Sequence, residues 1–505
     1  MDANKRIIVN TIAQYGKSIF NILLSLYSTR LVLEALNIND YGIYSVVGGV
    51  VGILGYLTNS LVVTTQRYLS YYQGANDKER TKLFFANSLF IHIVIGIAFC
   101  IIMLGAKDFF VNHFLNIDVQ RLDAAEYVYF ATVMMMLVTV ITAPFKAFLI
   151  AKENIVYISL IEVIDGILKL LLAMSLFVIS WDRLEFYATG MITVLLINLL
   201  AYIIYTFCKF DDSHFRCAKS TLSVPYIKQL LGFAGWTTYG MIAGMCQTQG
   251  FAVVLNKFFG TAMNAAFGIG SQVNGAIRFV STSILNAMNP QIMQAEGNQD
   301  RRKMLDLAAK ESKFSTALML LVSIPLIIEM PYILQFWLKT VPDNTCLFCR
   351  ALMLAFLFDQ TTLGLHAANQ ATGHIKVYSI IMFTPKILIV PMAWAFLKFG
   401  ISVEWVMAVY VAIELIVAIC RLPYLKTTTG LHIGKYLSTV IVPLFPLVLT
   451  EGIVCLGITY LLDFRYRFIV TVMVAALVGL ATLFIFSLNK NEKEFILRII
   501  RKRRH

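Results

Sequence analysis

Charge is scarce in this chain of 505 residues. Only 14% of the residues are charged, and the 29 acidic residues are outnumbered by 42 Lys and Arg. Soluble globular domains carry about 25% charged residues, so the composition excludes an ordinary soluble enzyme or binding domain. What replaces the charge is apolar: 58% of the residues are hydrophobic and the mean hydropathy is +0.74.

Motifs for nucleotide, metal or covalent chemistry are also missing. The sequence contains no G-x-x-x-x-G-K-[ST] loop, no H-E-x-x-H and no Cys/His set with zinc spacing. The seven His are scattered, which disfavours a Ser/His/Asp arrangement. Cys346 and Cys349 form a C-x-x-C that could be a redox pair or could pack as apolar groups. We therefore predict a protein that is not an enzyme and uses no cofactor or metal.

Apolar stretches of helix-spanning length follow one another along almost the whole chain. A helix needs about 20 apolar residues to cross the hydrocarbon core of a bilayer. The sequence predicts an all-α, polytopic membrane protein with about fourteen transmembrane helices, although twelve remain possible if two weak stretches are re-entrant. The stretches are 7–34, 41–66, 83–105, 127–150, 155–180, 184–207, 228–256, 262–288, 314–337, 346–370, 375–398, 403–422, 437–461 and 467–488.

Basic residues orient these spans. With the N-terminus inside, 28 Lys and Arg fall in inside segments and 8 in outside segments. Cytoplasmic loops are enriched in Lys and Arg, so both termini are predicted to be cytoplasmic. The net charge of +13 is spread over alternating loops rather than one face, which excludes nucleic acid as a partner. The terminal run from Arg501 to Arg504 is expected to contact membrane lipids with anionic headgroups.

The chain repeats itself at an offset of about 220 residues. Tyr41-Gly42-Ile43 corresponds to Phe267-Gly268-Ile269, and Gly74 before Arg80 corresponds to Gly297 before Arg301. The match predicts two six-helix lobes, 1–225 and 226–430, related by a pseudo-twofold axis along the membrane normal. Residues 431–505 would add two helices and a basic tail. Chance glycine spacing in apolar sequence is the alternative explanation.

Polar residues inside the spans form stripes at steps of three and four. Such side chains share one helical face and should point to a wet cavity or a partner, because a charge at the centre of a membrane helix costs about 2.5–3.5 kcal/mol. Lys169 can pair with Asp165 on its own helix, whereas Lys17 and Arg278 have no acidic residue within four positions. Candidates for ion coupling are Asp359, Asp165 and Glu162.

Several segments resemble polysaccharide-biosynthesis membrane proteins. These are residues 30–44 (RLVLEALNINDYGIY), 67–74, 144–154 (PFKAFLIAKEN) and 289–301. The sequence is similar to Wzx-type flippases of the multidrug/oligosaccharidyl-lipid/polysaccharide exporter superfamily. The resemblance covers most of the chain and is best over 1–315.

The resemblance implies a central cavity and transfer of an undecaprenyl-pyrophosphate-linked oligosaccharide across the bacterial cytoplasmic (inner) membrane. This transfer would serve the biosynthesis of surface polysaccharide or O-antigen. The resemblance also implies polysaccharide assembly proteins as partners. The cations at Lys17 and Arg278 would neutralise phosphate. Sugar hydroxyls would be met by Asn21, Gln247, Gln249 and Asn286.

Two other functions remain open at this point. A multidrug or cation antiporter of the same superfamily would favour an acidic cavity, and the excess of cations in the spans disfavours it. A membrane polysaccharide polymerase or ligase would need a sizeable outside loop, and the longest predicted outside loop is 105–126.

Overall fold

The computed structural model describes residues 55–114, 119–211, 223–338, 341–464, 466–489 and 492–494, with scattered positions from 16 to 44. Within these residues the chain is almost entirely helical and contains no strand. It divides into two compact units, which we describe separately. Unit 1 is Met1–Met241 with Met293–Gln299, and unit 2 is Ile242–Ile292 with Asp300–His505. Met241 and Ile242 lie in one continuous helix, and so do Ile292 and Met293, so the chain passes from one unit to the other within a helix.

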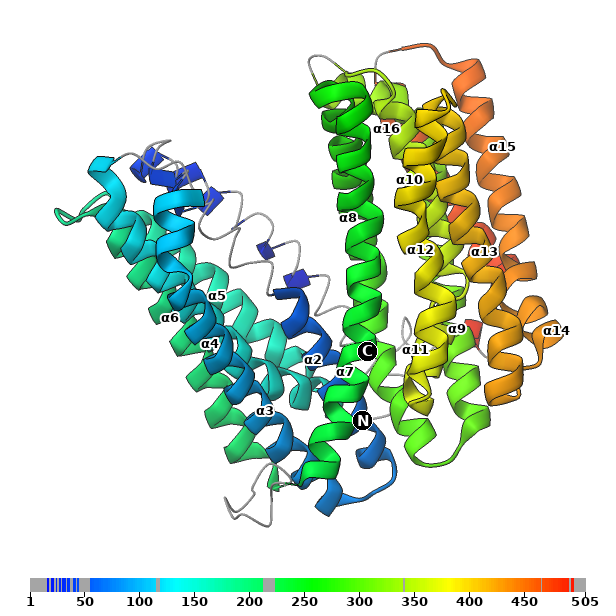
Figure 1. Cartoon of the computed structure of the whole chain (residues 1–505). Coiled ribbons are helices and arrows are strands. Elements are labelled where there is room, and N and C mark those ends of the chain that lie inside the picture. Colours follow the sequence, from blue (N-terminus) through cyan, green and yellow to red (C-terminus); the bar gives the residue numbers. More distant parts are fainter. Residues whose placement is uncertain are drawn as a thin grey trace, which may run out of the picture. The chain divides into compact units, whose positions relative to one another are not determined.

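Unit 1 is organised around α4, which packs against α2, α3 and α6. Small and apolar residues such as Ala125, Val128 and Ala147 are fully buried along it. The unit contains α2 (Gly55–Gly74), α3 (Lys78–Gly105), α4 (Leu122–Ala151), α5 (Ile155–Ser175), α6 (Arg183–Lys209) and most of α7 (Val224–Met245), drawn from blue to green in Figure 1.

Unit 2 is organised around α9, which packs against α10, α11, α15 and α16. A break at Gly260, with φ 79°, divides the long α8, and only glycine adopts that backbone conformation without strain. The helices of unit 2 are α8 (Phe251–Gly297, except its last turns), α9 (Arg301–Trp337), α10 (Thr345–Gln360), α11 (Leu363–Thr372), α12 (Ile375–Lys398), α13 (Val403–Thr429), α14 (Ile433–Tyr436), α15 (Phe445–Leu461) and α16 (Arg467–Thr482).

The last two long helices are tied to α9 by a buried ion pair. Arg467 of α16 donates from Nε and one terminal nitrogen to the two carboxylate oxygens of Glu329 at 3.0 and 3.1 Å. Thr471 donates to the same carboxylate at 2.8 Å, and the Arg467 guanidinium stacks over Tyr332. Glu329 is fully buried, so it depends on this pairing for its charge.

The predicted spans agree well with the helices. Every predicted stretch from residue 83 onward contains a described helix, while 7–34 is described only at scattered positions and much of 41–66 lies outside the described residues. Among the described helices, eight are long and apolar enough to cross a bilayer, or nine if the bent pair α10 and α11 forms one span. α5 is not among the eight because it carries Glu162, Asp165 and Lys169.

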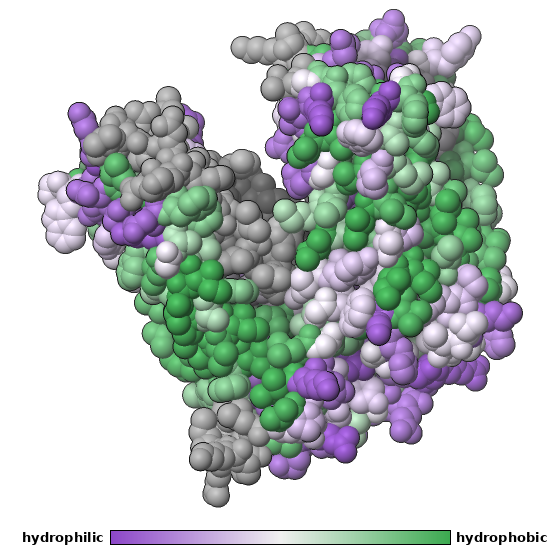
Figure 2. Space-filling view, viewed as in Figure 1, coloured by the Kyte–Doolittle hydropathy of each residue, from purple (hydrophilic) through white to green (hydrophobic). Residues whose placement is uncertain are grey.

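The side of unit 2 in view in Figure 2 has an apolar band across the middle of its helices and polar residues at both ends, as a bilayer requires. The division into residues 1–225, 226–430 and 431–505 stays a prediction.

The repeat is visible in the ends of α2 and α8. Asn76 and Gln299 are both left-handed, with φ 54° and 60°, and the following Asp77 and Asp300 both cap the next helix through the amide three residues on. All of these positions differ by 223, close to the offset found in the sequence. The predicted correspondence of Gly74 with Gly297 is therefore confirmed in the backbone.

The two glycines also lie in a reciprocal contact within unit 1. A Cβ added at Gly74 would lie 2.0 Å from the carbonyl oxygen of Gln294, and one added at Gly297 would lie 1.9 Å from that of Tyr71. Gln294 is the repeat equivalent of Tyr71, at the same offset of 223. Each helix thus uses the same surface to meet the other, as in an interface with twofold symmetry.

Candidate functional site

In unit 1 the charged residues of α5 meet the first helical segment and α4. Glu162 accepts ion pairs from Lys17 and from Lys146, the latter at 2.5 Å. Asn21 donates to the backbone oxygen of Glu162 at 3.2 Å. Lys17, which the sequence left without a local partner, is therefore paired across helices. One carboxylate shared by two ammonium groups leaves this group of side chains with one excess positive charge.

One turn along α5 lies a neutral pair. Lys169 donates to Asp165 at 2.7 Å, which confirms the pairing predicted from their spacing of four. Asn198 of α6 donates to the second oxygen of Asp165, also at 2.7 Å. These two donors, one on each oxygen, hold the carboxylate in place, and the bond from Asn198 fixes α5 against α6.

In unit 2 a buried acid on α13 joins two other helices. Glu414 accepts from the Gln247 side-chain amide at 2.6 Å and from Lys386 of α12 at 2.9 Å. Gln247 lies in a π-helical turn (Cys246–Gly250), whose wider winding changes the direction in which side chains leave the helix. Gln247 is thus not free to meet a sugar while this bond is made.

Asp359 lies where α10 ends and the chain bends by 47° into α11. Arg421 donates to its carboxylate at 2.7 Å, and Lys386 lies 4.0 Å away. A second nitrogen of Arg421 donates to Thr362 at 3.1 Å, within the bend itself. Asp359, predicted as a lone acidic residue, is in fact the acceptor of a buried network, and it holds the bend in place.

The remaining predicted residues are less constrained. Arg278 is exposed, rests over the Phe356 ring at 4.6 Å, and forms no ion pair with any acidic residue that the structure describes. Gln249, in the π-helical turn Cys246–Gly250, is exposed, and Asn286 of α8 is half-buried. None of these three is engaged in a described hydrogen bond of its side chain, so each remains available to a ligand.

The two groups of side chains described above, one in each unit, carry the same balance of charge. The group in unit 1 has three cations (Lys17, Lys146, Lys169) and two acids (Glu162, Asp165). The group in unit 2 has three cations (Arg278, Lys386, Arg421) and two acids (Asp359, Glu414). Each group therefore keeps one positive charge that its own acids do not neutralise.

Two of these residues were missed in the sequence. Glu414 was overlooked as a single acid in an apolar stretch, although an ionisable residue in a span is itself a signal of function. Arg421 lies at the end of the predicted span 403–422 and counts among the 28 inside Lys and Arg, but α13 extends to Thr429 and Arg421 is only 3% exposed. Cys346 and Cys349 are both free, and the buried Cys349 packs in the apolar core of unit 2.

The comparisons with known proteins concern the fold. No family model matches the sequence, and no curated protein matches it. Several solved structures are similar at 15–16% identity. A MOP-superfamily transporter from Pyrococcus furiosus, described as having a binding pocket of reversed polarity, matches with a TM-score of 0.72 over 85% of this chain and 96% of its own.

Two further structures agree. An outward-facing MATE-family multidrug resistance transporter and a MATE transporter in a straight conformation both match with a TM-score of 0.73, at 16% identity, over 87% of this chain and 98% of theirs. The chain therefore has the fold of MATE transporters of the MOP superfamily, a multi-pass membrane fold.

Proposed function

We propose that the protein flips a lipid-linked oligosaccharide, carried on undecaprenyl pyrophosphate, across the bacterial cytoplasmic membrane by alternating access. The observation that carries the proposal is the excess of one positive charge in each of the two groups of side chains described above, with the exposed Arg278 forming no ion pair among the described residues. A pyrophosphate headgroup cannot cross hydrocarbon without its water, and cationic donors replace that water with charge-assisted hydrogen bonds.

Individual residues would have unequal roles. In unit 2, Arg278 is the phosphate ligand because it has no competing carboxylate among the described residues. In unit 1, Lys17 can bind phosphate because its acid is shared with Lys146. Gln249 and Asn286 meet sugar hydroxyls. Asn21 keeps a buried Oδ1 without a hydrogen bond, which leaves it an acceptor for a hydroxyl. Gln247 contributes only if Glu414 releases it.

The proposal is tested with the full chain reconstituted in vesicles that contain the lipid-linked oligosaccharide. Flipping is measured as the change in sugar accessible to a membrane-impermeant lectin. Arg278→Ala should slow flipping about tenfold or more, the value of one charge-assisted hydrogen bond, and Arg278→Lys should restore part of the rate. Lys228→Ala removes an exposed charge at the start of α7 and serves as the control. Equal rates for Arg278→Ala and the control would refute the phosphate role.

A multidrug or cation antiporter is the second candidate, favoured by the fold shared with a multidrug resistance transporter. A cationic substrate needs an acid that is free to bind it. Glu162, Asp165, Asp359 and Glu414 are each paired with Lys or Arg, so this function would use the buried Glu311 or Glu451, whose carboxylates form no hydrogen bond among the described residues. Efflux of a cationic dye from the same vesicles, driven by a proton gradient, separates the two functions: dye efflux without sugar flipping would favour the antiporter.

A further inference from the structure

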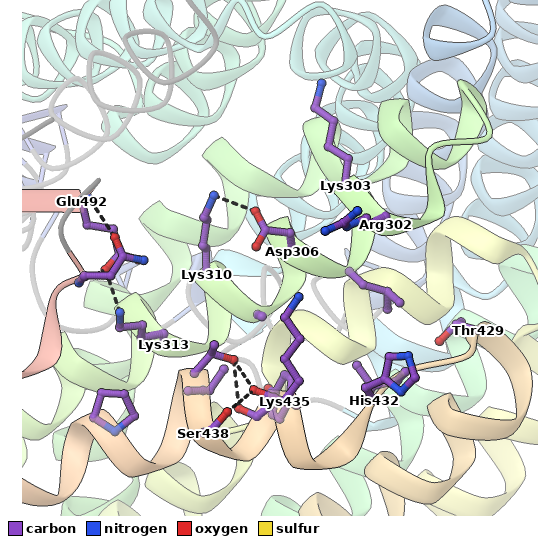
Figure 3. A pocket seen from close by; sticks show the side chains of 18 of the residues that line it. Arg302, Lys303, Asp306, Lys310, Lys313, Thr429, His432, Lys435, Ser438 and Glu492 are labelled. Carbon is purple, nitrogen blue, oxygen red and sulfur yellow. Dashed lines mark hydrogen bonds and ion pairs between the residues drawn. The ribbon is translucent and has the colours of Figure 1, made fainter.

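Unit 2 contains a second basic site, outside the buried groups described above. It is a cavity of about 1150 Å³ at one end of the helices. Its walls come from the first turns of α9, from the end of α13 through α14 to Pro443, and from residues 486–489 and Glu492, which follow α16. Six basic residues line it: Arg301, Arg302, Lys303, Lys310, Lys313 and Lys435 (Figure 3).

The acidic residues of the cavity are all engaged by its walls. Asp306 binds Lys310 at 2.7 Å, and Glu492 binds Lys313 at 2.7 Å. Asp300 caps α9 by accepting from the backbone amide of Lys303 at 3.0 Å. The two ion pairs neutralise two of the six basic side chains, and the charge of Asp300 offsets one more, so the cavity keeps an excess of three positive charges.

Of the other four basic side chains, Arg301 donates to the backbone oxygen of Thr428 at 3.5 Å, and three cations remain over the cavity. Arg302, Lys303 and Lys435 pair with no acidic side chain in the part of the chain that the structure describes. Figure 3 shows Lys435 extending from α14 toward α9, where Arg302 and Lys303 begin the helix. Three ammonium and guanidinium groups around one hollow form a site for a ligand with more than one negative charge.

Ion pairs and hydrogen bonds hold the walls of this cavity in place. Lys313 is 6% exposed, and its amine holds Glu492 and so fixes the segment that follows α16. That segment is closed by a reciprocal pair of bonds, from the Asn489 amide to Glu492 and from the Glu492 amide to Asn489. The ion pair of the buried Lys313 thus ties Glu492, on one wall of the cavity, to α9 on the other.

Exposed apolar residues at the rim of the cavity indicate that its ligand comes from the membrane. Pro443 and Phe486 line the cavity, and Phe486 is 62% exposed. On the same elements Leu437, Val442 and Ile485 are exposed apolar side chains, which suits contact with acyl chains. The distribution of Lys and Arg among the loops predicts that this end of the helices lies at the cytoplasmic leaflet, whose surface carries anionic lipid.

We infer that this cavity binds the phosphate-bearing headgroup of an anionic phospholipid. The headgroup phosphate lies among Arg302, Lys303 and Lys435, and the acyl chains leave past Phe486. The site is separate from the groups proposed for the transported substrate, and it does not depend on what the protein transports.

The test is native mass spectrometry of the delipidated full chain, with phosphatidylglycerol, phosphatidylethanolamine or inorganic phosphate added. Wild type should bind phosphatidylglycerol well above phosphatidylethanolamine. The triple variant Arg302→Ala/Lys303→Ala/Lys435→Ala should bind phosphatidylglycerol about tenfold or more weakly. The matched control Lys209→Ala/Lys228→Ala/Lys398→Ala also removes three exposed charges and should bind as wild type.

Three results would overturn the inference. They are equal binding by the triple variant and the control, no preference for phosphatidylglycerol over phosphatidylethanolamine, and full displacement of the lipid by inorganic phosphate, which would make the ligand a soluble anion. Should the triple variant fail to fold, Lys435→Ala alone, a change of one exposed side chain, should still weaken phosphatidylglycerol binding severalfold while binding of phosphatidylethanolamine stays unchanged.

Discussion

Arg421 donates to Asp359 at 2.7 Å and to Thr362 at 3.1 Å, so one guanidinium on α13 holds both sides of the bend between α10 and α11. Because Arg421 is 3% exposed, its charge has no access to water when the carboxylate is lost. The pair is consequently a structural requirement of unit 2 as well as a candidate for coupling.

Replacing the acid of this pair should destabilise the protein strongly. Asp359→Asn leaves a buried guanidinium without its counter-charge, and breaking a buried pair in this way costs about 3–5 kcal/mol. The melting temperature in detergent measures the loss. Asp306→Asn breaks the exposed pair with Lys310 and should cost at most about 1 kcal/mol. Similar losses in the two variants would contradict the structural role of Asp359.

The reciprocal contact of Gly74 and Gly297 predicts intolerance to a single methyl group. Gly297→Ala places Cβ 1.9 Å from a backbone oxygen that cannot rotate away, so α2 and α8 must separate. We expect a loss of about 1–3 kcal/mol, as for overpacking in a core. Gly275→Ala on the same helix meets no atom within 4 Å and should be neutral or slightly stabilising. Thermal unfolding of Gly297→Ala and Gly275→Ala, compared with the wild type, tests this prediction.

A third prediction concerns acid stability at the loop end of α6. Asp182 caps α6 and accepts from Arg121 at 2.5 Å. Burial raises the pKa of this carboxyl, but the Arg121 guanidinium and the backbone amides of α6 outweigh burial and hold the pKa below its usual 3.8. A depressed pKa stabilises the folded state above the unfolded value, and that contribution is lost as the pH falls through the folded value.

The melting temperature of the wild type should therefore fall below about pH 4, where the unfolded carboxyl takes up its proton. Asp182→Asn should have a lower melting temperature at neutral pH and a shallower fall in acid. An acid slope identical to that of the wild type would show that other carboxyls account for the transition.

The ion pair of Lys17 with Glu162 predicts non-additive effects. Lys17→Gln leaves Glu162 with Lys146, so the loss of stability should be small, whereas Glu162→Gln leaves two ammonium groups together and should cost more. In the double variant Lys17→Gln/Glu162→Gln, the loss should be smaller than the sum of the single losses. If the losses of stability of the two single variants add up strictly in the double variant, as measured by thermal unfolding, the two side chains are not in contact.

The helices were predictable from the sequence because hydropathy reports on the bilayer directly, and the pair of Asp165 with Lys169 was predictable because it is local to one helix. The partners of Lys17 and Asp359 were not, since Glu162 and Arg421 lie 145 and 62 positions away and periodicity along a helix says nothing about which helix faces it. The boundary of the compact units within α7 was also hidden, because the helix continues through it without any change in composition.

The ion pair between Arg467 and Glu329 constrains how this protein can change in evolution. A stop codon ahead of α16 would strip the carboxylate of Glu329 of its counter-charge and leave it against lipid chains. Before α16 can be lost, Glu329 must be replaced by an apolar residue. That substitution alone leaves the buried Arg467 without its carboxylate partner. Loss of the terminal helical hairpin therefore requires two coordinated genetic steps, the first of which is harmful by itself.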